Sequence, residues 1–114
     1  MNYTNSKDFL GEIVHVKIDR KLGSLHPKHG FMYMLNYGFI PNTLSYDGEE
    51  LDAYIVGVFE PLEEFKGKVI AIIQRINDND DKLVVAPINV NYTDDQIRAL
   101  TEFQEQYFKS NIIR

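Results

Sequence analysis

Apolar and polar residues alternate along several short stretches of the chain, and alternation of this kind predicts half-buried strands. The clearest case is residues 12–18, EIVHVKI, where the apolar positions are all β-branched. Residues 31–41, FMYMLNYGFIP, alternate aromatic and aliphatic side chains, and Gly38 in this stretch allows a close backbone approach. Residues 51–59, LDAYIVGVF, predict a further strand that ends before Pro61.

The second half of the chain predicts two more strands separated by turns. Residues 60–68, EPLEEFKGK, have the composition of a connector. Residues 69–76, VIAIIQRI, are apolar without alternation, as in a strand that is buried on both faces. The acidic segment 77–81, NDNDD, predicts a loop, and residues 82–87, KLVVAP, predict the last strand.

One helix is expected after these strands, with Thr93 as its N-cap. Ile97, Leu100, Phe103 and Tyr107 follow at helical spacing and would form its apolar face. Five short strands and one helix predict a mainly β (α+β) fold. We expect a small closed or partly open β-barrel with the C-terminal helix packed outside.

Composition adds limits to this picture. A chain of 114 residues with 44% hydrophobic residues predicts a single domain over residues 1–114. The net charge of −5 gives no basic field for nucleic acid or an anionic membrane, and it suits divalent cations. Cysteine is absent, so any metal must be held by oxygen or imidazole. Without a signal-peptide core or a membrane-length apolar run, the sequence predicts a cytoplasmic protein.

Carboxylates gather at two places in the sequence. Asp47, Glu49 and Asp52 lie within six residues, and Asp52 falls just inside a predicted strand, where an unpaired carboxylate is costly. Asp78 and Asp80 lie in the acidic loop before the last strand. If both loops open at the same end of a barrel, their oxygens favour Mg²⁺, Mn²⁺ or Ca²⁺ over Zn²⁺. The alternative is that these are ordinary solvated turn residues. That alternative is favoured for the acidic loop taken alone, whereas metal binding or catalysis is favoured for the first group.

Six residues that can carry positive charge lie within thirteen positions upstream, and they would fit a phosphate beside a metal site. These are Lys17, Arg20, Lys21, His26, Lys28 and His29. The alternative is a basic surface loop that pairs with acids of the C-terminal helix. Tyr33 and Tyr37 share one face of an extended segment, either as ligands at the rim or as core rings with an exposed hydroxyl.

The order of these pieces carries a resemblance. YMLNYGFIPNTLSYDGEELDAYIVG, an apolar strand, DNDDKLVVAP and a helix with FQEQYFK together resemble the soluble family I inorganic pyrophosphatases. That family has Y-x-x-N-Y-G-[FY]-[IV]-P-x-T, then D-G-D-P-x-D, then D-x-K-[LIV]-x-x-x-P and a C-terminal F-x-x-x-Y helix. The resemblance covers roughly residues 31–108.

The resemblance implies an OB-like five-stranded barrel that hydrolyses diphosphate with Mg²⁺, or with Mn²⁺ as the alternative. It implies metal ligands at Asp47, Asp52, Asp78 and Asp80. It implies that Glu49 is the base that activates water, with Tyr37 and Lys82 as further catalytic residues. It implies phosphate binding by Tyr33 and Tyr107, and we expect Arg20 and Lys28 to supply positive charge to the substrate. It also favours a homo-oligomer.

The chain departs from the family pattern at several positions. Glu49 stands where the family has aspartate, Glu50 replaces a proline, and Phe108 intervenes before Lys109. The N-terminal hairpin that bears the family's further cations is compressed, and Lys17 aligns near its metal-linked glutamate. The alternative function is therefore a catalytically degenerate domain that binds a phosphorylated metabolite or a metal as a regulatory module. A nucleic-acid-binding barrel ranks last, because the sequence has no basic groove.

Overall fold

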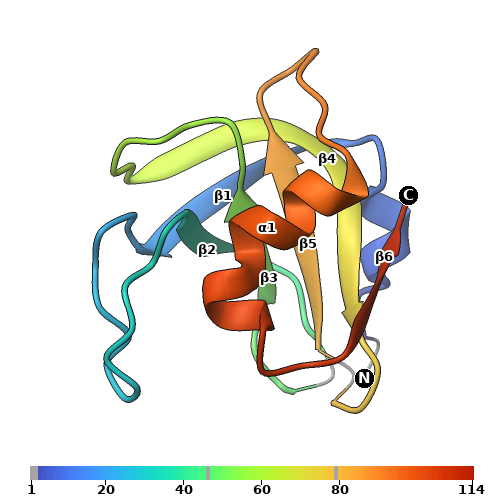
Figure 1. Cartoon of the computed structure of the whole chain (residues 1–114). Coiled ribbons are helices and arrows are strands. Elements are labelled where there is room, and N and C mark those ends of the chain that lie inside the picture. The colour runs from blue at the N-terminus through green and yellow to red at the C-terminus, as the bar shows by residue number, and fades with distance from the viewer. Residues whose placement is uncertain (1–2, 46, 79) are drawn as a thin grey trace.

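The computed structural model of the chain describes residues 3–45, 47–78 and 80–114, which form a curved β-sheet with one α-helix across it (Figure 1). A short 3₁₀ helix precedes the first strand. In chain order the elements are η1 (Ser6–Phe9), β1 (Ile13–Arg20), β2 (Asn36–Ile40), β3 (Leu51–Ile55), β4 (Glu64–Arg75), β5 (Asp81–Ala86), α1 (Asp94–Glu105) and β6 (Ser110–Ile113).

Pairing between β1 and β4 closes the sheet into a barrel. The strand order is β1-β2-β3-β5-β4-β6, and β1 also pairs with β4, so the first five strands form a closed ring. β3 and β5 run parallel, and the other pairs are antiparallel. The expected five-stranded barrel with a C-terminal helix outside it is therefore confirmed.

β4 is the longest strand, and it joins the two halves of the ring. Its first half pairs with β1, its second half pairs with β6, and a bulge between Val69 and Ala71 interrupts its pairing with β5. The expectation that residues 60–68 form a connector is wrong for Glu64–Lys68, which belong to β4. Gly67 lies in this segment. In the folded chain it lets β4 pass close to β5, because a Cβ there would lie 2.5 Å from the carbonyl oxygen of Ala86.

Gly38 has the close approach that the sequence predicted. A Cβ at this position would lie 1.9 Å from the carbonyl oxygen of Lys17 on β1, so only glycine fits here. Of the extended stretch expected over residues 31–41, only Asn36–Ile40 forms a strand. The preceding residues belong to a long loop between β1 and β2, where Leu25 and Met32 form an isolated bridge.

The helix begins where the sequence placed it. Thr93 accepts a hydrogen bond from Gln96 N–H, and the Gln96 side chain accepts one from Thr93 N–H, which completes a capping box. The helix ends at Glu105, so Tyr107 lies in the turn beyond it with 67% of its surface exposed, and the expectation that it forms part of the helical face is wrong. β6 and η1 were not expected from the sequence. Among the described residues, no helix is long and apolar enough to cross a membrane.

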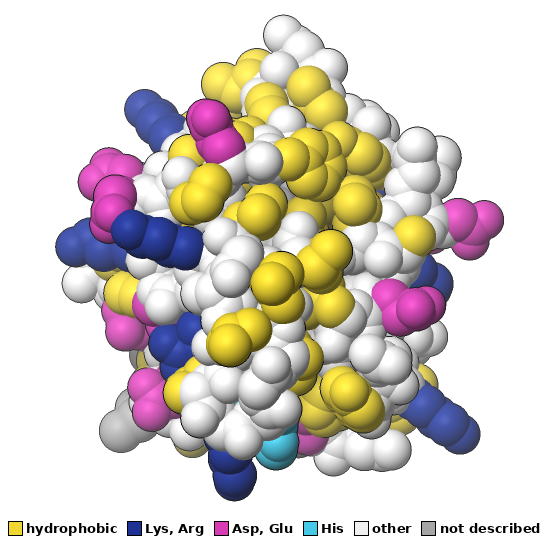
Figure 2. Space-filling model, turned by 60° about the vertical axis from the view of Figure 1, so that its left-hand side comes forward, with side chains coloured by type: hydrophobic (Ala, Val, Ile, Leu, Met, Phe, Trp, Pro, Cys, Tyr) yellow, Lys and Arg dark blue, Asp and Glu magenta, His cyan; other side chains and the backbone are white. Residues whose placement is uncertain are grey.

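Two groups of buried apolar side chains lie on opposite faces of the strands. One includes Val16, Leu51 and Leu83, and the other includes Tyr54 and Ile97, through which α1 packs on the sheet. Figure 2 brings forward the side that carries the loop between β1 and β2, and hydrophobic side chains gather on it in a broad band.

Candidate functional site

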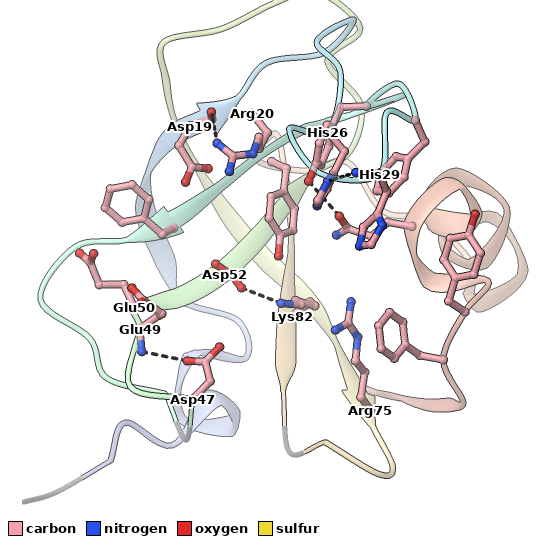
Figure 3. Close-up of a pocket in the computed structure, with 17 residues that line it drawn as sticks. Asp19, Arg20, His26, His29, Asp47, Glu49, Glu50, Asp52, Arg75 and Lys82 are labelled. Atoms are coloured by element: carbon pink, nitrogen blue, oxygen red, sulfur yellow. Dashed lines mark hydrogen bonds and ion pairs between the residues drawn. The ribbon is translucent and has the colours of Figure 1, made fainter.

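A cavity of about 860 Å³ opens at one end of the barrel beside α1 (Figure 3). Its walls come from the ends of β1 to β5, from the loop between β1 and β2, and from the turn after α1. The carboxylates Asp47, Glu49 and Glu50 lie at one end, and His26 and His29 lie at the other. The charged side chains of Asp52, Lys82 and Arg75 lie between these ends.

Asp47 is held by the turn that precedes β3. Its carboxylate accepts hydrogen bonds from Ser45 Oγ and from Glu49 N–H, the latter over 2.9 Å. Gly48 turns the backbone with a φ of 85°, a conformation that glycine adopts without strain. Burial raises the pKa of Asp47, but these two hydrogen bonds and the charge of Lys82 together outweigh burial, and the pKa lies below its ordinary value. Asp47 is therefore ionised and aimed by its own turn.

Asp52 and Lys82 are brought together by the parallel pairing of β3 and β5. The two residues are direct partners in that register, and Lys82 Nζ lies 2.6 Å from an Asp52 carboxylate oxygen. Lys82 Nζ also donates to Asp80 over 2.9 Å. Only 3% of the lysine side chain is exposed, so its two carboxylate partners compensate for its burial. Burial raises the pKa of Asp80, and the charge of Lys82 opposes this increase.

The oxygen atoms of Asp47, Asp52 and Asp80 form a compact group. One carboxylate oxygen from each lies within 4.8 Å of the others, which is close enough for a single cation to contact all three. All three residues were expected as metal ligands. The group joins a turn, the start of β3 and the loop before β5, which shows that both acidic loops open at the same end of the barrel.

Tyr37 lies above this group. Its hydroxyl faces the Asp52 carboxylate, and its ring centroid lies 5.6 Å from Lys82 Nζ. Burial, together with the charge of Asp52, raises the pKa of Tyr37 well above its ordinary value. Tyr37 therefore keeps its proton and can act only as a hydrogen-bond donor or acceptor in the cavity.

Asp78 occupies a different position from the other expected ligands. Its carboxylate faces Arg75 at 3.4 Å, and it lies outside the compact carboxylate group and the cavity lining that the described residues form. Asp78 would have to leave Arg75 to reach a cation beside Asp80. Its assignment as a metal ligand stays a prediction.

The residues expected to bind phosphate are divided in the same way. Arg20, Tyr33 and Tyr107 line the cavity, and the Tyr33 hydroxyl also lies beside Arg20. Lys28 is exposed and is not among the residues that line the cavity, so its expected contact with substrate has no support from its position. Its backbone N–H donates to His26 Nδ1, as does that of His29, and these bonds fold the loop back on itself.

Three charged residues of the cavity wall were not predicted as site residues from the sequence. Asp19 and Glu50 face the cavity, and burial raises the pKa of Asp19. Arg75 is the third, and it was recognisable as an arginine inside an apolar strand that must find a partner. The alternative for the basic segment was pairing with acids of the C-terminal helix, whereas Lys21 of this segment pairs with Glu63, which precedes β4.

Arg75 is held by a buried network that ties β4 to the end of α1. Its Nε and Nη2 donate to the two carboxylate oxygens of Glu105 over 3.0 and 2.7 Å. Glu105 also accepts from the Tyr54 hydroxyl, which in turn accepts from Gln104. The remaining nitrogen, Nη1, faces Asp80 at 3.2 Å. Arg75 is thus fixed by the helix on one side and reaches the carboxylate group on the other.

A small closed barrel with clustered carboxylates beside buried cations defines a class of site that suits divalent metals and phosphate groups. Residues 10–112 match the family model described as inorganic pyrophosphatase. The chain therefore belongs to the inorganic pyrophosphatase family, as the resemblance of its motifs predicted.

Individual relatives agree with this membership. The chain is 34% identical over 83 residues to an inorganic pyrophosphatase of Neisseria meningitidis, a match that covers 65% of this chain and 44% of that protein. An inorganic pyrophosphatase of Haemophilus influenzae gives the same identity and coverage. The matched segment thus spans less than half the length of each of these two relatives.

Solved structures show the same fold. An inorganic pyrophosphatase from Neisseria gonorrhoeae superposes with a TM-score of 0.67 at 25% identity, over 85% of this chain and 74% of the other. A pyrophosphatase from Helicobacter pylori superposes with a TM-score of 0.68 over the whole of this chain and 90% of the other, at 18% identity. The barrel and its helix are therefore common to these proteins.

Proposed function

We propose that the chain hydrolyses inorganic diphosphate to two phosphates and that it depends on a divalent cation. The observation that carries this proposal is the compact group of Asp47, Asp52 and Asp80 oxygens, with Lys82 and Tyr37 directly beside it. Membership in the inorganic pyrophosphatase family supports the same reaction.

The donor set fits a hard cation. All three donors are carboxylate oxygens, the kind of ligand that Mg²⁺ and Mn²⁺ prefer. Asp47, Asp52 and Asp80 would hold the ion, and Asp78 would join them after release from Arg75. A bound divalent cation would lower the pKa of water and neutralise charge on the phosphates. Mg²⁺ is the proposed ion, with Mn²⁺ as the alternative.

The side chains around this group have separate tasks. Lys82 positions Asp52 and Asp80 through its two hydrogen bonds. Its ammonium group also lies beside the position that a phosphate oxygen would take next to these carboxylates. Tyr37, which keeps its proton, can donate to the same substrate. Arg20 and Tyr33 bind phosphate from the opposite wall, and Tyr107 does so from the turn after α1.

Glu49 is the proposed base. It lies in the exposed turn next to Asp47, with its side chain at the cavity and its backbone N–H fixed by the Asp47 carboxylate. In this position it would take the proton from the attacking water. The anchored backbone leaves the longer glutamate side chain free to reach the position of the shorter aspartate in the family pattern.

One observation favours the alternative of a binding module without efficient turnover. In this structure both buried cations of the cavity are already paired with carboxylates, Lys82 with Asp52 and Asp80, and Arg75 with Glu105. A phosphate must compete with these partners unless a metal ion draws the carboxylates away. The location in the cytoplasm and the homo-oligomeric state stay predictions.

The decisive experiment measures phosphate release from diphosphate by the purified chain, with and without added Mg²⁺. We expect metal-dependent release in the wild type and at least a 100-fold lower rate in Asp52→Asn, which keeps the size of the side chain but removes its charge. Glu60→Gln is the matched control, because Glu60 is exposed and does not line the cavity. Its rate should equal that of the wild type.

Two further outcomes separate the candidate functions. Glu49→Gln should lower turnover more than it weakens metal binding, whereas an equal loss of both would make Glu49 a ligand. If the wild type releases no phosphate but Mg²⁺ still raises its melting temperature in an Asp52-dependent manner, the binding module is the correct function and the hydrolase is not.

A further inference from the structure

The cavity has a second end that the proposed reaction does not use. We call it the aromatic end, and it is formed by rings from the loop between β1 and β2 and from the turn after α1. Its residues are His26, His29, Phe31 and Phe108. None of them carries a fixed negative charge, so this end has no carboxylate with which to hold a metal ion.

The rings of the aromatic end are held in place by contacts with one another and with α1. The His26 centroid lies 4.8 Å from the centroids of both His29 and Phe31. The centroid of the Phe31 ring lies 6.2 Å from that of Phe103 on α1, and the two rings meet edge to face. His26 Nδ1 accepts the backbone N–H groups of residues 28 and 29, which fixes the orientation of its ring. A wall of this kind is preorganised for stacking.

Arg75 joins the aromatic end to the end that carries the carboxylates, which we call the acidic end. Its guanidinium lies 3.6 Å from the centroid of the Phe108 ring, and its Nη1 faces Asp80 of the carboxylate group. A ligand that bridges the two ends would pass this arginine. Arginine planes and aromatic rings are the surfaces on which nucleic-acid bases stack.

The size of the cavity also exceeds the need of the proposed substrate. Cavities of about 300–1,000 Å³ bury most of a drug-sized ligand, and this one has about 860 Å³. Diphosphate and its metal ions would occupy the acidic end alone. The aromatic end then offers room and a stacking surface for an organic group attached to the phosphates.

We propose that this cavity binds nucleoside diphosphates, with the phosphates at the acidic end and the base at the aromatic end. The phosphate contacts rest on the proposed function, whereas the base contacts do not. In the reaction, water attacks the terminal phosphorus and the bond from that phosphorus to the bridging oxygen breaks. The products are a nucleoside monophosphate, inorganic phosphate and one proton, which passes to Glu49 and then to solvent.

Equilibrium binding tests the proposal without turnover. With Mg²⁺ present, the affinities of the full chain for α,β-methylene adenosine diphosphate and for methylenediphosphonate are measured by calorimetry. The two ligands share uncleavable phosphorus groups, and only the first has a base. Stacking of one base contributes about 5- to 150-fold in affinity, so we expect the nucleotide analogue to bind at least 5-fold more tightly. Equal affinities would overturn the proposal.

Substitutions locate the base. Phe31→Leu and Phe108→Leu remove a stacking ring and retain an apolar side chain, and each should reduce the affinity ratio toward one. Phe59→Leu is the matched control, because Phe59 is 60% exposed and does not line the cavity. The two sites are independent, so a fold defect in one variant leaves the other as the test. A ratio unchanged in the variant or variants that fold would overturn the placement of the base.

Hydrolysis separates this proposal from the preceding one. If the chain cleaves adenosine diphosphate and not diphosphate, the substrate class stands and the proposed function fails. If it cleaves diphosphate but binds both analogues equally, the proposed function stands and the substrate class fails. An alkyl diphosphate that binds as tightly as the nucleotide analogue would show that the aromatic end selects for apolar bulk, and would overturn the assignment to a base.

Discussion

Two groups of charged side chains lie next to each other in this protein, and they differ in how completely they are paired. In the carboxylate group, Lys82 is shared by Asp52 and Asp80, whose side chains are 25% and 18% exposed. In the other group, Arg75 meets Glu105 through two hydrogen bonds, and both side chains are at most 8% exposed.

The difference indicates different roles. Around Arg75 and Glu105 the hydrogen-bonding capacity is filled, with Tyr54 and Gln104 completing the network. Around Lys82 negative charge is in excess and reaches the cavity, so a cation can still be added. The first group fastens the end of α1 to the barrel, and the second is available for chemistry.

The largest expected loss of stability comes from breaking the network of Arg75 and Glu105. Glu105→Gln removes the charge that the buried Arg75 guanidinium meets through two hydrogen bonds, and loss of one partner of a buried pair costs about 3–5 kcal/mol. We expect the free energy of unfolding in urea to fall by about that amount. Glu102→Gln, an exposed position on the same helix, is the control and should change stability by less than about 0.5 kcal/mol. Similar losses in the two variants would mean that the network is not structural.

A smaller loss of stability, which Mg²⁺ should partly reverse, is expected in the carboxylate group. Lys82→Met leaves Asp52 and Asp80 facing each other, and we expect a loss of about 1–3 kcal/mol in the presence of a chelator. Mg²⁺ should restore part of this loss, because a bound cation replaces the ammonium charge. Glu105→Gln should show no such recovery. Recovery in both variants, or in neither, would remove the distinction between the two groups.

Much of the carboxylate group was predictable from the sequence. Asp47 and Asp52 follow one turn and one strand start, so local spacing alone places them together. The network of Arg75 was not predictable, because its partner Glu105 lies thirty residues away, and only the packing of α1 joins them. Lys28 shows the opposite limit, since it lies in a basic segment of the sequence but is exposed and does not line the cavity.

The strands show the same limit. Alternation located the cores of β1 and β2, and apolar runs bounded by turn signals located those of β3, β4 and β5. It missed Glu64–Lys68 and β6, whose strand character depends on pairing with partners that are distant in sequence. Thr93 was found because its cap is a local interaction.

The N-cap of α1 offers a third test, in which the expected loss in the free energy of unfolding is smaller. Thr93→Ala removes the cap, and we expect a loss of about 1 kcal/mol in the free energy of unfolding. Mg²⁺ affinity should not change, because the network at the other end of the helix keeps Arg75 and Asp80 in place. A parallel loss of Mg²⁺ affinity would show that the helix controls the carboxylate group along its whole length.

The smallest effect concerns the aromatic end. Partial burial and the nearby charge of His29 lower the pKa of His26 below 6.5. At a pH between the folded-state pKa of His26 and its unfolded-state pKa, the unfolded chain binds a proton more readily than the folded chain does. The stability that His26 contributes therefore falls as the pH falls through that range. An NMR titration should give a midpoint for His26 below 6.5, and His26→Gln should flatten the pH dependence of stability there. A midpoint above 6.5 would contradict the structure of the loop.

The central claim is that the carboxylate group binds a divalent cation, and a calorimetric titration with Mg²⁺ in the absence of substrate tests it most directly. The account predicts saturable binding to the wild type and to Glu60→Gln, and an affinity at least 10-fold lower in Asp52→Asn. Indistinguishable isotherms for the wild type and Asp52→Asn would contradict it.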